Sequence, residues 1–452
     1  MIKIKPTGDI AISRLRPDEY QRNFADVHPP LTANEALIES DRCYYCYDAP
    51  CTAACPTGID IPSFIRKIAT GNIKGSAHDI LKENIMGAIC ARVCPTEVLC
   101  EGACVRNTKE HKPVAIGALQ RHATDWLFAH KIQLFKRAEA TGKRVAVVGG
   151  GPAGLSCAHR LSMLGHSVVV CEARDTMAGL NEYGIAAYKV KDDIVRRELD
   201  YLLEIGGIEP RLNQCLGRDF NLADLTAIYD AVFLGLGLAG VNGLGLEPEP
   251  VSGVYDAVDY IARLRQAKDL STLPVGRRVV VIGGGMTAID IASQIKRLGA
   301  EDVTIVYRRG GEHMGASAKE QNWAQVSGVK IKQWGAPRRL VVDQGLLTGV
   351  EFDYTRLDEQ GKVVGTGVTF TLAADMLFKA IGQTFVKSVV ADRVDVLALK
   401  NGRLAVDADR KTSLARVWAG GDCVADGQDL TVAAVEDGKR AAHAIDRFLR
   451  AR

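Results

Sequence analysis

Short apolar runs followed by glycines and then by helical periodicity occur twice in the last two-thirds of the chain. Residues 144–148 (RVAVV) lead into GGGPAG, a stretch with Leu155, Ala158 and Leu161 on one helical face, and the run 167–171 (SVVVC). Residues 278–282 (RVVVI) lead into GGGMTA, a second helical stretch and the run 303–307 (VTIVY). The repeated strand–helix–strand opening predicts two doubly wound domains.

The pattern changes between and after these openings. Residues 340–371 alternate as antiparallel strands do, and 416–450 read as a strand, a Gly-Gly-Asp turn and a closing helix. Residues 61–70 and 116–130 predict helices in a first zone with few strand-like runs. The predicted fold class is α/β, with a helical domain over 1–140, one Rossmann-like domain over 141–250 and 387–452, and a second Rossmann-like domain, over 251–386, inserted in it.

Composition and charge exclude several classes of protein. The chain is 47% hydrophobic, as globular proteins are, and its 57 basic and 54 acidic residues leave a net charge of only +3. That balance argues against a nucleic-acid or membrane-surface binder. No apolar run reaches membrane-spanning length, and the first 16 residues lack the apolar core of a signal peptide. We therefore expect a cytoplasmic protein without a nucleic-acid or membrane partner.

Eight of the twelve cysteines lie between Cys43 and Cys104, as two groups of four. The groups are Cys43-x2-Cys46-x4-Cys51-x3-Cys55-Pro and Cys90-x3-Cys94-Pro-x4-Cys100-x3-Cys104. Closely spaced thiolates with a Cys-Pro ending are typical of [4Fe-4S] proteins. Two zinc sites are the alternative, although only one C-x2-C pair exists and no histidines have ligand spacing. His111, His122 and His130 are expected on the surface, and Cys157, Cys171, Cys215 and Cys423 as buried apolar thiols without a redox-active C-x2-C pair.

The first glycine loop predicts a dinucleotide site. Gly149, Gly151 and Gly154, with Ala153 beside the last, follow a strand and open a helix, and Glu172 ends the next strand. This arrangement brings a pyrophosphate to a helix N-terminus and a carboxylate to a ribose. FAD is the predicted ligand because the Gly-Gly-Asp turn with Asp422, before the helix starting near Thr431 and Val432, resembles the ribityl-binding turn of flavoproteins that carry such a glycine loop. The alternative for Asp422 is a plain turn or cap residue.

The second loop predicts a nicotinamide dinucleotide site. Gly283, Gly285, Met286, Thr287 and Ala288 form its loop and helix start, and Ala380, Ile381 and Gly382 are expected near the nicotinamide. Arg308 and Arg309 follow the second strand, where a cation could bind the 2′-phosphate of NADP. The pair could also be simply solvated, and related enzymes of either specificity carry it. We expect NAD(H), with NADP(H) left open.

These motifs together resemble dihydropyrimidine dehydrogenases in their N-terminal half and, less closely, glutamate synthase small subunits. The five residues between Cys94 and Cys100 favour the former. The resemblance implies one cluster on Cys43, Cys46, Cys51 and Cys104 and another on Cys55, Cys94, Cys100 and Gln120. Cys90 would then bind no iron. Without the resemblance, Gln120 would be interpreted as an ordinary helix residue. The resemblance also implies FAD contacts at Gly179, Leu180, Lys189 and Leu216, in a region where Ala178, Ala186 and Lys191 depart from the family pattern.

The resemblance implies an electron-input subunit. Electrons would pass from NAD(P)H to FAD, the cluster with Gln120, the other cluster and then a partner chain, and hydride transfer itself needs no catalytic acid or base. The chain has no residues left for an FMN barrel, which needs about 250. We therefore expect a heteromer with an FMN- and iron–sulfur-containing subunit that reversibly reduces uracil or thymine. A glutamate synthase small subunit is the alternative enzyme, and an iron–sulfur scaffold the alternative without catalysis.

Overall fold

The computed structural model describes residues 9–191, 193–246, 251–393 and 395–451. It divides into two compact units, each described by itself below. One comprises the residues up to Val27 together with Tyr183–Tyr188 and Val241–Gln383, and the other His28–Glu182, Lys189–Gly240 and Thr384–Arg452. The expected domain boundary at residue 250 lies outside the described residues, as does half of the N-terminal stretch considered for a signal peptide. None of the described helices is both long and apolar enough to cross a membrane.

Helices alone build the cysteine-rich part of the larger unit, and no strand precedes residue 144 in the part of the chain that the structure describes. The apolar faces of α4, α5 and α8 pack together around Phe64, Ile80 and Leu119. The predicted helices over 61–70 and 116–130 are confirmed as α4 and α8. The helices are α2 (Ala33–Asp41), α3 (Pro50–Ala54), α4 (Ile61–Ala69), α5 (Ile73–Glu83), α6 (Gly87–Val93), α7 (Val105–Glu110) and α8 (Ile116–Ala129), with a 3₁₀ turn η1 at Thr96–Val98.

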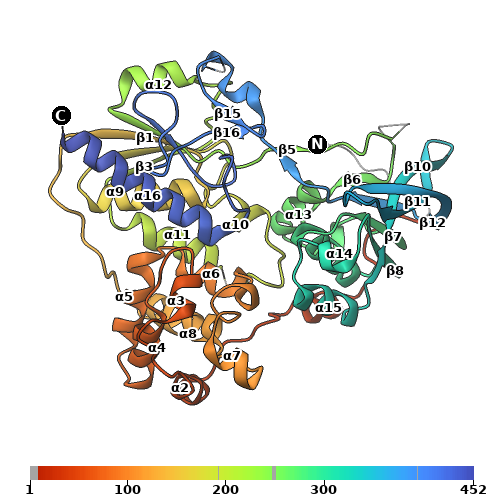
Figure 1. Cartoon of the computed structure of the whole chain (residues 1–452), viewed down its shortest axis with the longest axis horizontal. Coiled ribbons are helices and arrows are strands. Elements are labelled where there is room, and N and C mark those ends of the chain that lie inside the picture. Colours follow the sequence, from red (N-terminus) through yellow and green to blue (C-terminus); the bar gives the residue numbers. More distant parts are fainter. Residues whose placement is uncertain (1–8, 192, 247–250, 394, 452) are drawn as a thin grey trace. The chain divides into compact units, whose positions relative to one another are not determined.

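A five-stranded parallel sheet of order β17-β4-β1-β2-β3 forms the rest of this unit. After the second nucleotide-binding region, the chain returns to this sheet and adds β17 to it. Val417 of β17 pairs with Val232 of β4. In Figure 1, α12 lies on one side of the sheet and α9, α11 and α16 on the other. The elements are β1 (Arg144–Val148), α9 (Pro152–Met163), β2 (Ser167–Cys171), α10 (Leu180–Tyr183), α11 (Ile194–Leu203), β3 (Ile208–Arg211), α12 (Leu222–Ile228), β4 (Ala231–Leu234), η4 (Lys387–Arg393), β15 (Leu399–Lys400), β16 (Arg403–Leu404), β17 (Val417–Ala419) and α16 (Thr431–Arg450).

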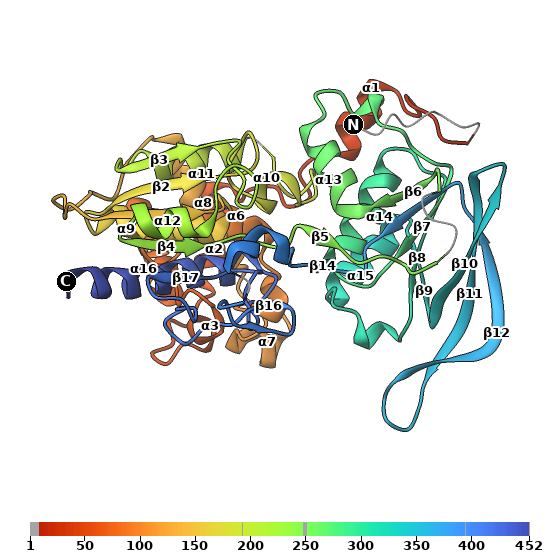
Figure 2. The same ribbon diagram turned by 90° about the horizontal axis from the view of Figure 1, so that it is seen from above.

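The smaller unit also contains a five-stranded parallel sheet, of order β6-β13-β7-β8-β9. Val279 and Val281 face a core shared with α13 and α14, whereas Val280 and Ile282 face the antiparallel sheet β10-β11-β12. Figure 2 shows that sheet beside the parallel strands. The elements are α1 (Pro17–Asn23), β6 (Val254–Asp256), α13 (Ala257–Gln266), η2 (Leu270–Thr272), β7 (Arg278–Ile282), α14 (Met286–Arg297), β8 (Asp302–Tyr307), η3 (Gly311–His313), α15 (Ala318–Val326), β9 (Lys330–Gln333), β10 (Gly335–Asp343), β11 (Leu346–Leu357), β12 (Val363–Ala373) and β13 (Met376–Lys379), while β5 (Gly240–Val241) pairs with β14 (Gln383–Thr384) where the chain passes between the units.

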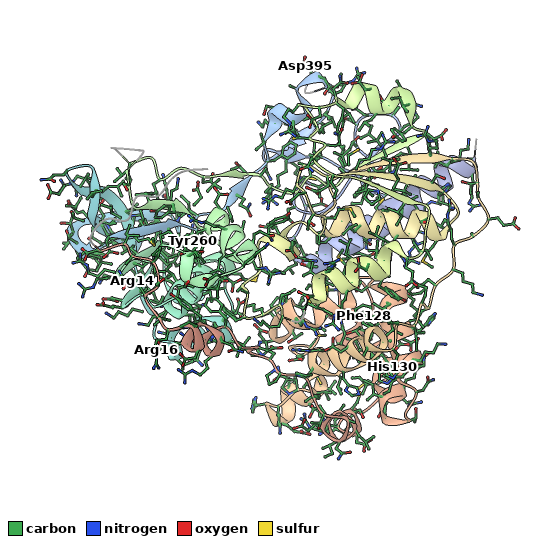
Figure 3. All side chains as sticks on the ribbon, turned by 180° about the vertical axis from the view of Figure 1, so that it is seen from behind. Arg14, Arg16, Phe128, His130, Tyr260 and Asp395 are labelled. Atoms are coloured by element: carbon green, nitrogen blue, oxygen red, sulfur yellow. The ribbon has the colours of Figure 1, made fainter. Side chains whose placement is uncertain are left out.

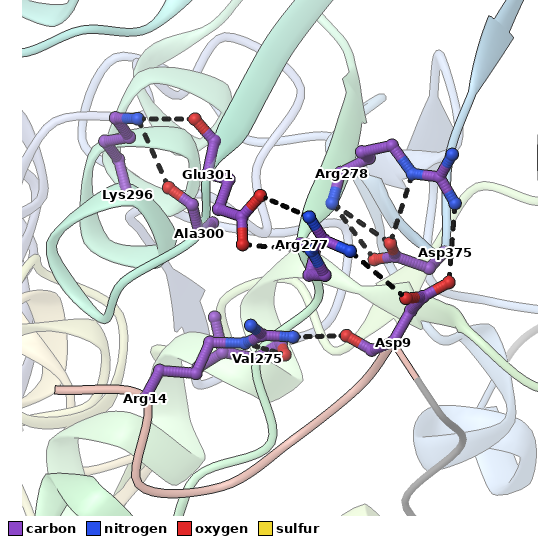
Figure 4. A network of polar contacts seen from close by, with 9 residues as sticks. All are labelled: Asp9, Arg14, Val275, Arg277, Arg278, Lys296, Ala300, Glu301 and Asp375. Carbon is purple, nitrogen blue, oxygen red and sulfur yellow. Dashed lines mark hydrogen bonds and ion pairs between the residues drawn. The ribbon is translucent and has the colours of Figure 1, made fainter.

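Residues 9–27 pack with the smaller unit, although they precede the cysteines in sequence. Ile10, Tyr20 and Phe24 are buried in the core shared with α13 and α14. A charged network holds the start of this segment, as Figure 4 shows: Asp9 pairs with Arg278 at 3.4 Å, and Arg277 makes two hydrogen bonds of 2.8 and 2.9 Å to Glu301. The burial of these three large side chains stabilises the segment in the smaller unit, although the cysteine-rich part of the larger unit follows it in the sequence.

The crossing of α9 and α16 depends on a glycine. A Cβ added at Gly438 would lie 2.1 Å from the carbonyl oxygen of Ala153 and 2.8 Å from the backbone nitrogen of Cys157. Ser156 Oγ also donates a hydrogen bond of 2.7 Å to the Val435 carbonyl across this crossing. The two helices therefore touch backbone to backbone at Gly438.

We expect Gly438→Ala to lower the free energy of unfolding by about 1–3 kcal/mol, because the helices must separate to admit the methyl group. Gly365→Ala is the matched control, since a Cβ at Gly365 meets no atom closer than 3.9 Å. Urea unfolding followed by circular dichroism measures both. Equal stabilities of the two variants would show that the crossing tolerates a side chain.

Candidate functional site

Cys43, Cys46, Cys51 and Cys104 line one pocket. The first two lie in the loop after α2, Cys51 is on α3 and Cys104 caps α7. Apolar side chains of α4 and of the start of α8 complete its walls (Ile61, Pro62, Ile65 and Ile116). Burial and the neighbouring Cys104 and Cys43 thiols raise the pKa of the Cys51 thiol to about 11. The structure thus brings together the four thiols of the first expected cluster, in a setting that fits a group whose irons each take one sulfur ligand.

Cys55, Cys94 and Cys100 form a second group with Cys90 near the end of α6. Cys94 follows the last residue of α6, and the neighbouring Cys90 side chain, together with burial, raises the pKa of the Cys94 thiol. The nearby Cys100 and Cys55 thiols add to that rise. Among the described residues, no three His, Cys, Asp or Glu side chains meet closely enough to hold a single metal ion. A cubane separates its ligand sulfurs further than one ion does, because each sulfur binds a different iron.

Gln120 is buried on α8, with 8% of its surface exposed. Its side-chain nitrogen donates a hydrogen bond of 2.7 Å to the carbonyl of Gly87, the first residue of α6. The side-chain oxygen accepts no hydrogen bond from any described residue. A buried amide whose orientation is fixed and whose oxygen is left over suits an oxygen ligand to iron better than an ordinary helix residue.

The N-terminus of α6 is capped by a residue that the sequence analysis missed. Glu198 of α11 accepts hydrogen bonds from the backbone N–H groups of Ala88 and Ile89 at 2.8 and 3.2 Å. Burial raises the pKa of the Glu198 carboxyl to about 8, against its hydrogen bonds and the nearby Arg92. No sequence signal could have linked Glu198 to residues more than 100 positions away.

We expect Glu198 to make stability depend on pH. Because its folded pKa lies above the ordinary value of 4.5, ionisation destabilises the fold, and stability is lost as the pH rises from about 4.5 to about 8. Glu198→Gln keeps an acceptor for the two N–H groups but cannot ionise, so its melting temperature should vary less between pH 5 and 8. The exposed Glu204→Gln should leave the wild-type pH dependence, and parallel curves for E198Q and wild type would contradict this assignment.

The loop after β1 has the geometry of a pyrophosphate cradle. Gly149 has φ +101°, and a Cβ there would lie 2.2 Å from the Gly235 carbonyl oxygen. A Cβ at Gly154 would lie 1.9 Å from the Gly149 oxygen, whereas one at Gly151, at the start of α9, would meet nothing closer than 3.8 Å. The first and third glycines are therefore needed for packing, while the second leaves open space at a helix N-terminus.

Glu172 holds this loop in place. Its carboxylate accepts hydrogen bonds from the Gly150 and Arg174 N–H groups at 2.8 and 2.9 Å. Gly179, with φ +55°, approaches the same loop, since a Cβ added to it would lie 2.8 Å from Gly151 Cα. Ala178, which departs from the family pattern, has φ +88°, a conformation that favours glycine.

Asp422 lies in the turn between β17 and α16. Burial raises the pKa of its carboxyl to about 6, with Asp429 adding to the rise. A second missed residue supports the turn: buried Asp437 accepts a hydrogen bond of 2.9 Å from the Gly421 N–H and pairs with Arg410 at 2.7 Å. Thr431, the first residue of α16, donates a hydrogen bond of 2.9 Å to buried Asn181.

The remaining expected FAD residues differ in accessibility. Leu180 is exposed and Lys189 half-buried, whereas Val432 and Leu216 are buried, Leu216 among the apolar side chains packed with α12. The structure therefore gathers the glycine loop, Glu172 and Gly179 directly, and the Asp422 turn reaches them because Gly421 packs against Ala153.

We expect Glu172→Gln to weaken FAD binding about 10- to 100-fold, because an amide cannot accept both backbone N–H groups with two oxygens. The iron content should stay unchanged, since the eight cysteines expected near the clusters all lie between residues 43 and 104, outside this loop. Flavin per chain after dialysis, with iron measured on the same sample, tests this. Glu209→Gln, on exposed β3, is the control and should retain full flavin; retention of flavin by E172Q as well would contradict the role given to Glu172.

The loop after β7 has the same geometry. Gly283 has φ +148°, and a Cβ there would lie 2.2 Å from the Ala380 carbonyl oxygen, the counterpart of the Gly149 approach to Gly235. A Cβ at Gly285 would meet nothing within 4 Å. Met286 and Thr287 are half-buried at the start of α14 and Ala288 is buried. The loop therefore leaves open the same space for a dinucleotide.

The residues expected around that dinucleotide are in place along the carboxyl ends of the strands. Arg308 is exposed and Arg309 half-buried directly after β8. Ala380, Ile381 and Gly382 follow β13, where Asn242 donates hydrogen bonds of 3.2 Å to the carbonyls of Ile381 and Gly382. Ligands of such sheets bind at this edge, beside the strand where the order reverses.

The histidines and cysteines expected outside the two sites differ in exposure. His111 and His130 are exposed as expected, whereas His122 is half-buried. His130, labelled in Figure 3, follows α8 and stacks on the Trp126 ring with a centroid distance of 4.1 Å. Cys157, Cys171 and Cys423 are buried, but the expectation for Cys215 is wrong, since it is only half-buried in the loop before Leu216. A loop between strand and helix does not enclose a side chain as a helix face does.

Two family models match the chain in the regions that these sites occupy. The model described as dihydropyrimidine dehydrogenase domain II, 4Fe-4S cluster, matches residues 20–132, and the pyridine nucleotide-disulphide oxidoreductase model matches residues 143–438. The chain belongs to the pyridine nucleotide-disulphide oxidoreductases, here with an N-terminal 4Fe-4S domain. It is an oxidoreductase that uses FAD, a nicotinamide dinucleotide and iron–sulfur.

The chain is also similar to individual proteins of known name and to solved structures. The NAD-dependent dihydropyrimidine dehydrogenase subunit PreT of Salmonella typhimurium is 35% identical over 432 residues, 95% of this chain and 98% of that protein. The glutamate synthase [NADPH] small chain of Escherichia coli is 34% identical over 446 residues, 94% of each chain. The structure of Mycobacterium tuberculosis FprA in complex with NADPH is similar with a TM-score of 0.57 and 17% identity over 68% of this chain and 85% of that one, which shows the shared fold.

Proposed function

We propose that this chain is the electron-input subunit of a dihydropyrimidine dehydrogenase. It would take electrons from NAD(H) and pass them through FAD and two [4Fe-4S] clusters to an FMN- and iron–sulfur-containing partner. The partner would reversibly reduce uracil or thymine to the 5,6-dihydropyrimidine. The observation that carries the proposal is the 35% identity to a PreT subunit over nearly its whole length, joined to the pocket lined by Cys43, Cys46, Cys51 and Cys104.

The proposed ligands agree with the arrangement of the side chains. Cys43, Cys46, Cys51 and Cys104 would hold one cluster, and Cys55, Cys94, Cys100 and Gln120 the other. Apolar walls limit water around the first set, and the hydrogen bond to Gly87 orients the amide of Gln120. A flavin accepts a hydride and releases single electrons, which is the chemistry needed between a nicotinamide and an iron–sulfur cluster.

The protein's own contribution to the flavin and nicotinamide sites is positional. The loops at Gly149 and Gly283 bring backbone N–H groups of α9 and α14 to the two pyrophosphates, and Glu172 keeps the first loop in shape. No side chain needs to act as acid or base in hydride transfer, so holding the reacting rings in position is the main catalytic requirement. We propose NAD(H) rather than NADP(H), since the PreT relative is named NAD-dependent.

A glutamate synthase small chain is the second candidate. The observation in its favour is the 34% identity over 94% of the Escherichia coli small chain, nearly equal to the PreT match. In that role the same cofactors would deliver electrons for glutamate formation. The two candidates differ in the partner that receives the electrons and in the nicotinamide that the relatives are named for, NAD for PreT and NADPH for the glutamate synthase small chain.

Co-expression of the chain with each candidate partner distinguishes the two proposed functions. The chain is produced anaerobically with a candidate FMN-containing subunit or with a glutamate synthase large subunit, and NADH-dependent uracil reduction is measured beside glutamine-dependent glutamate synthesis. We expect activity in the first assay. Activity in the second assay alone would replace the proposed function with the alternative, and the absence of flavin bleaching by both NADH and NADPH would refute both.

We expect Gln120→Ala to leave NADH-driven flavin reduction intact while slowing onward electron transfer at least about tenfold, because the second cluster loses a ligand. Stopped-flow absorbance separates the two steps. Gln360→Ala, in an exposed hairpin turn, is the control. Unchanged onward transfer in Q120A would mean that Gln120 does not bind iron.

A further inference from the structure

Asn181 is a buried residue of the larger unit that belongs neither to the expected FAD contacts nor to the proposed cluster ligands. It lies on α10 directly after Leu180, with 1% of its surface exposed. Its side-chain oxygen accepts a hydrogen bond from Thr431 Oγ1 at 2.9 Å, and its side-chain nitrogen donates to the sulfur of Met86 at 3.6 Å. Both polar atoms of this buried amide are used, so its orientation is fixed.

Met86 lies at the start of the second cluster site. It is the N-cap residue of α6 and is buried, and its N–H donates to the side-chain oxygen of buried Asn84 at 3.0 Å. The next residue is Gly87, whose carbonyl accepts the amide of Gln120 at 2.7 Å. The sulfur that Asn181 contacts therefore belongs to the neighbour of the residue that orients a proposed cluster ligand.

Thr431 belongs to the expected FAD site, as the first residue of α16. The same helix contacts the cysteine-rich part further along, where Lys439 Nζ donates to the carbonyls of Thr57 and Glu83 at 2.9 and 3.2 Å. Two sets of hydrogen bonds thus connect α16 with the cysteine-rich part, and the set that passes through Asn181 leads to the start of α6.

The rate of electron transfer between two centres falls exponentially as the gap between them widens, so small displacements of either site change the rate. A hydrogen-bonded path from the first residue of α16 to the N-cap of α6 limits such displacements. We propose that Asn181 is a positioning residue that fixes the gap between FAD and the second cluster by joining Thr431 to Met86. The inference rests on the cofactor sites of the proposed function. No bond forms or breaks at Asn181, since the electrons pass between the cofactors themselves.

The experiment follows electrons from the second cluster to the flavin in the full chain, purified anaerobically with its cofactors. The chain is reduced by illumination with a deazaflavin and a sacrificial amine, and is then mixed in the dark with NAD⁺ or NADP⁺. Stopped-flow absorbance follows hydride transfer out of the flavin. Freeze-quench electron paramagnetic resonance follows the oxidation of the second cluster, which passes its electron to the emptied flavin.

We expect Asn181→Ala and Met86→Leu to slow oxidation of the second cluster about three- to tenfold, the range of one hydrogen bond, while hydride transfer keeps its rate. Met86→Leu conserves side-chain volume and loses only the sulfur, so it serves as the test where N181A fails to fold. Met86→Gln, whose oxygen can accept a hydrogen bond, should recover part of the rate. Met163→Leu, half-buried at the end of α9, is the matched control and should keep the wild-type rate.

Two further measurements do not depend on turnover. Flavin and iron per chain should be the same in M86L as in the wild type, because neither set of proposed ligands is changed. In the chain stripped of FAD, amide hydrogen exchange over residues 86–90 should be faster in N181A and M86L than in M163L, because the contact that holds the start of α6 is lost.

Three results would overturn the proposal. The first is oxidation of the second cluster at the wild-type rate in both N181A and M86L. The second is equal slowing of hydride transfer and cluster oxidation, which would make Asn181 a general structural residue. The third is loss of flavin or iron from M86L, which would mean that the contact serves cofactor binding instead of the gap between the cofactors.

The measurement needs no partner chain, and neither uracil nor glutamate takes part in it. Failure of the chain to deliver electrons to an FMN-containing subunit would refute the proposed function without changing the rates measured within the chain. Unchanged cluster oxidation in the variants would refute the role of Asn181 and leave the proposed function standing.

Discussion

The N-terminus of α6 carries the contact on which the iron–sulfur part of the molecule depends. Glu198 of α11 accepts the N–H groups of Ala88 and Ile89, and the Gly87 carbonyl on the same turn receives the amide of Gln120. The helix beyond carries Cys90 and ends at Cys94. Because a buried helix end must satisfy its N–H groups, the carboxyl that does so also sets where the cysteines of α6 lie. A residue of the nucleotide-binding part thereby positions residues of the cysteine-rich part.

The two glycine loops are held by the same steric requirement in separate sheets. In each, the first glycine lies against a carbonyl that follows the neighbouring strand, Gly235 for β4 and Ala380 for β13. A side chain at either glycine would push the loop away from the adjoining strand, and the N-terminus of α9 or α14 would move with it. The strand order places both loops where ligands of such sheets bind, so the requirement for packing and the requirement for nucleotide binding coincide.

Local patterns predicted the regular elements well, because strand and helix periodicity records burial directly. The limits of β1, β2 and β7 and the closing helix α16 agree with the apolar runs, since each strand starts with an exposed polar residue and then becomes buried. The placement of residues 9–27 was not predicted, since a short apolar segment can be buried against any complementary surface. The roles of Glu198 and Asp437 were also missed, because an acidic residue in a helix has no sequence signal for a partner far along the chain.

The sequence by itself determined that eight thiols are available in two groups and that two glycine loops follow two strands, since these features depend on residues a few positions apart. The tertiary structure decided how the thiols divide: Cys104 joins Cys43, Cys46 and Cys51, whereas Cys55 lies with Cys94 and Cys100. It also decided that the side-chain nitrogen of Gln120 donates to the Gly87 carbonyl while its side-chain oxygen is left unused. Spacing limits only which neighbours a residue can reach along one helix or loop, and the packing of α4, α5, α6 and α8 selects which of those loops meet.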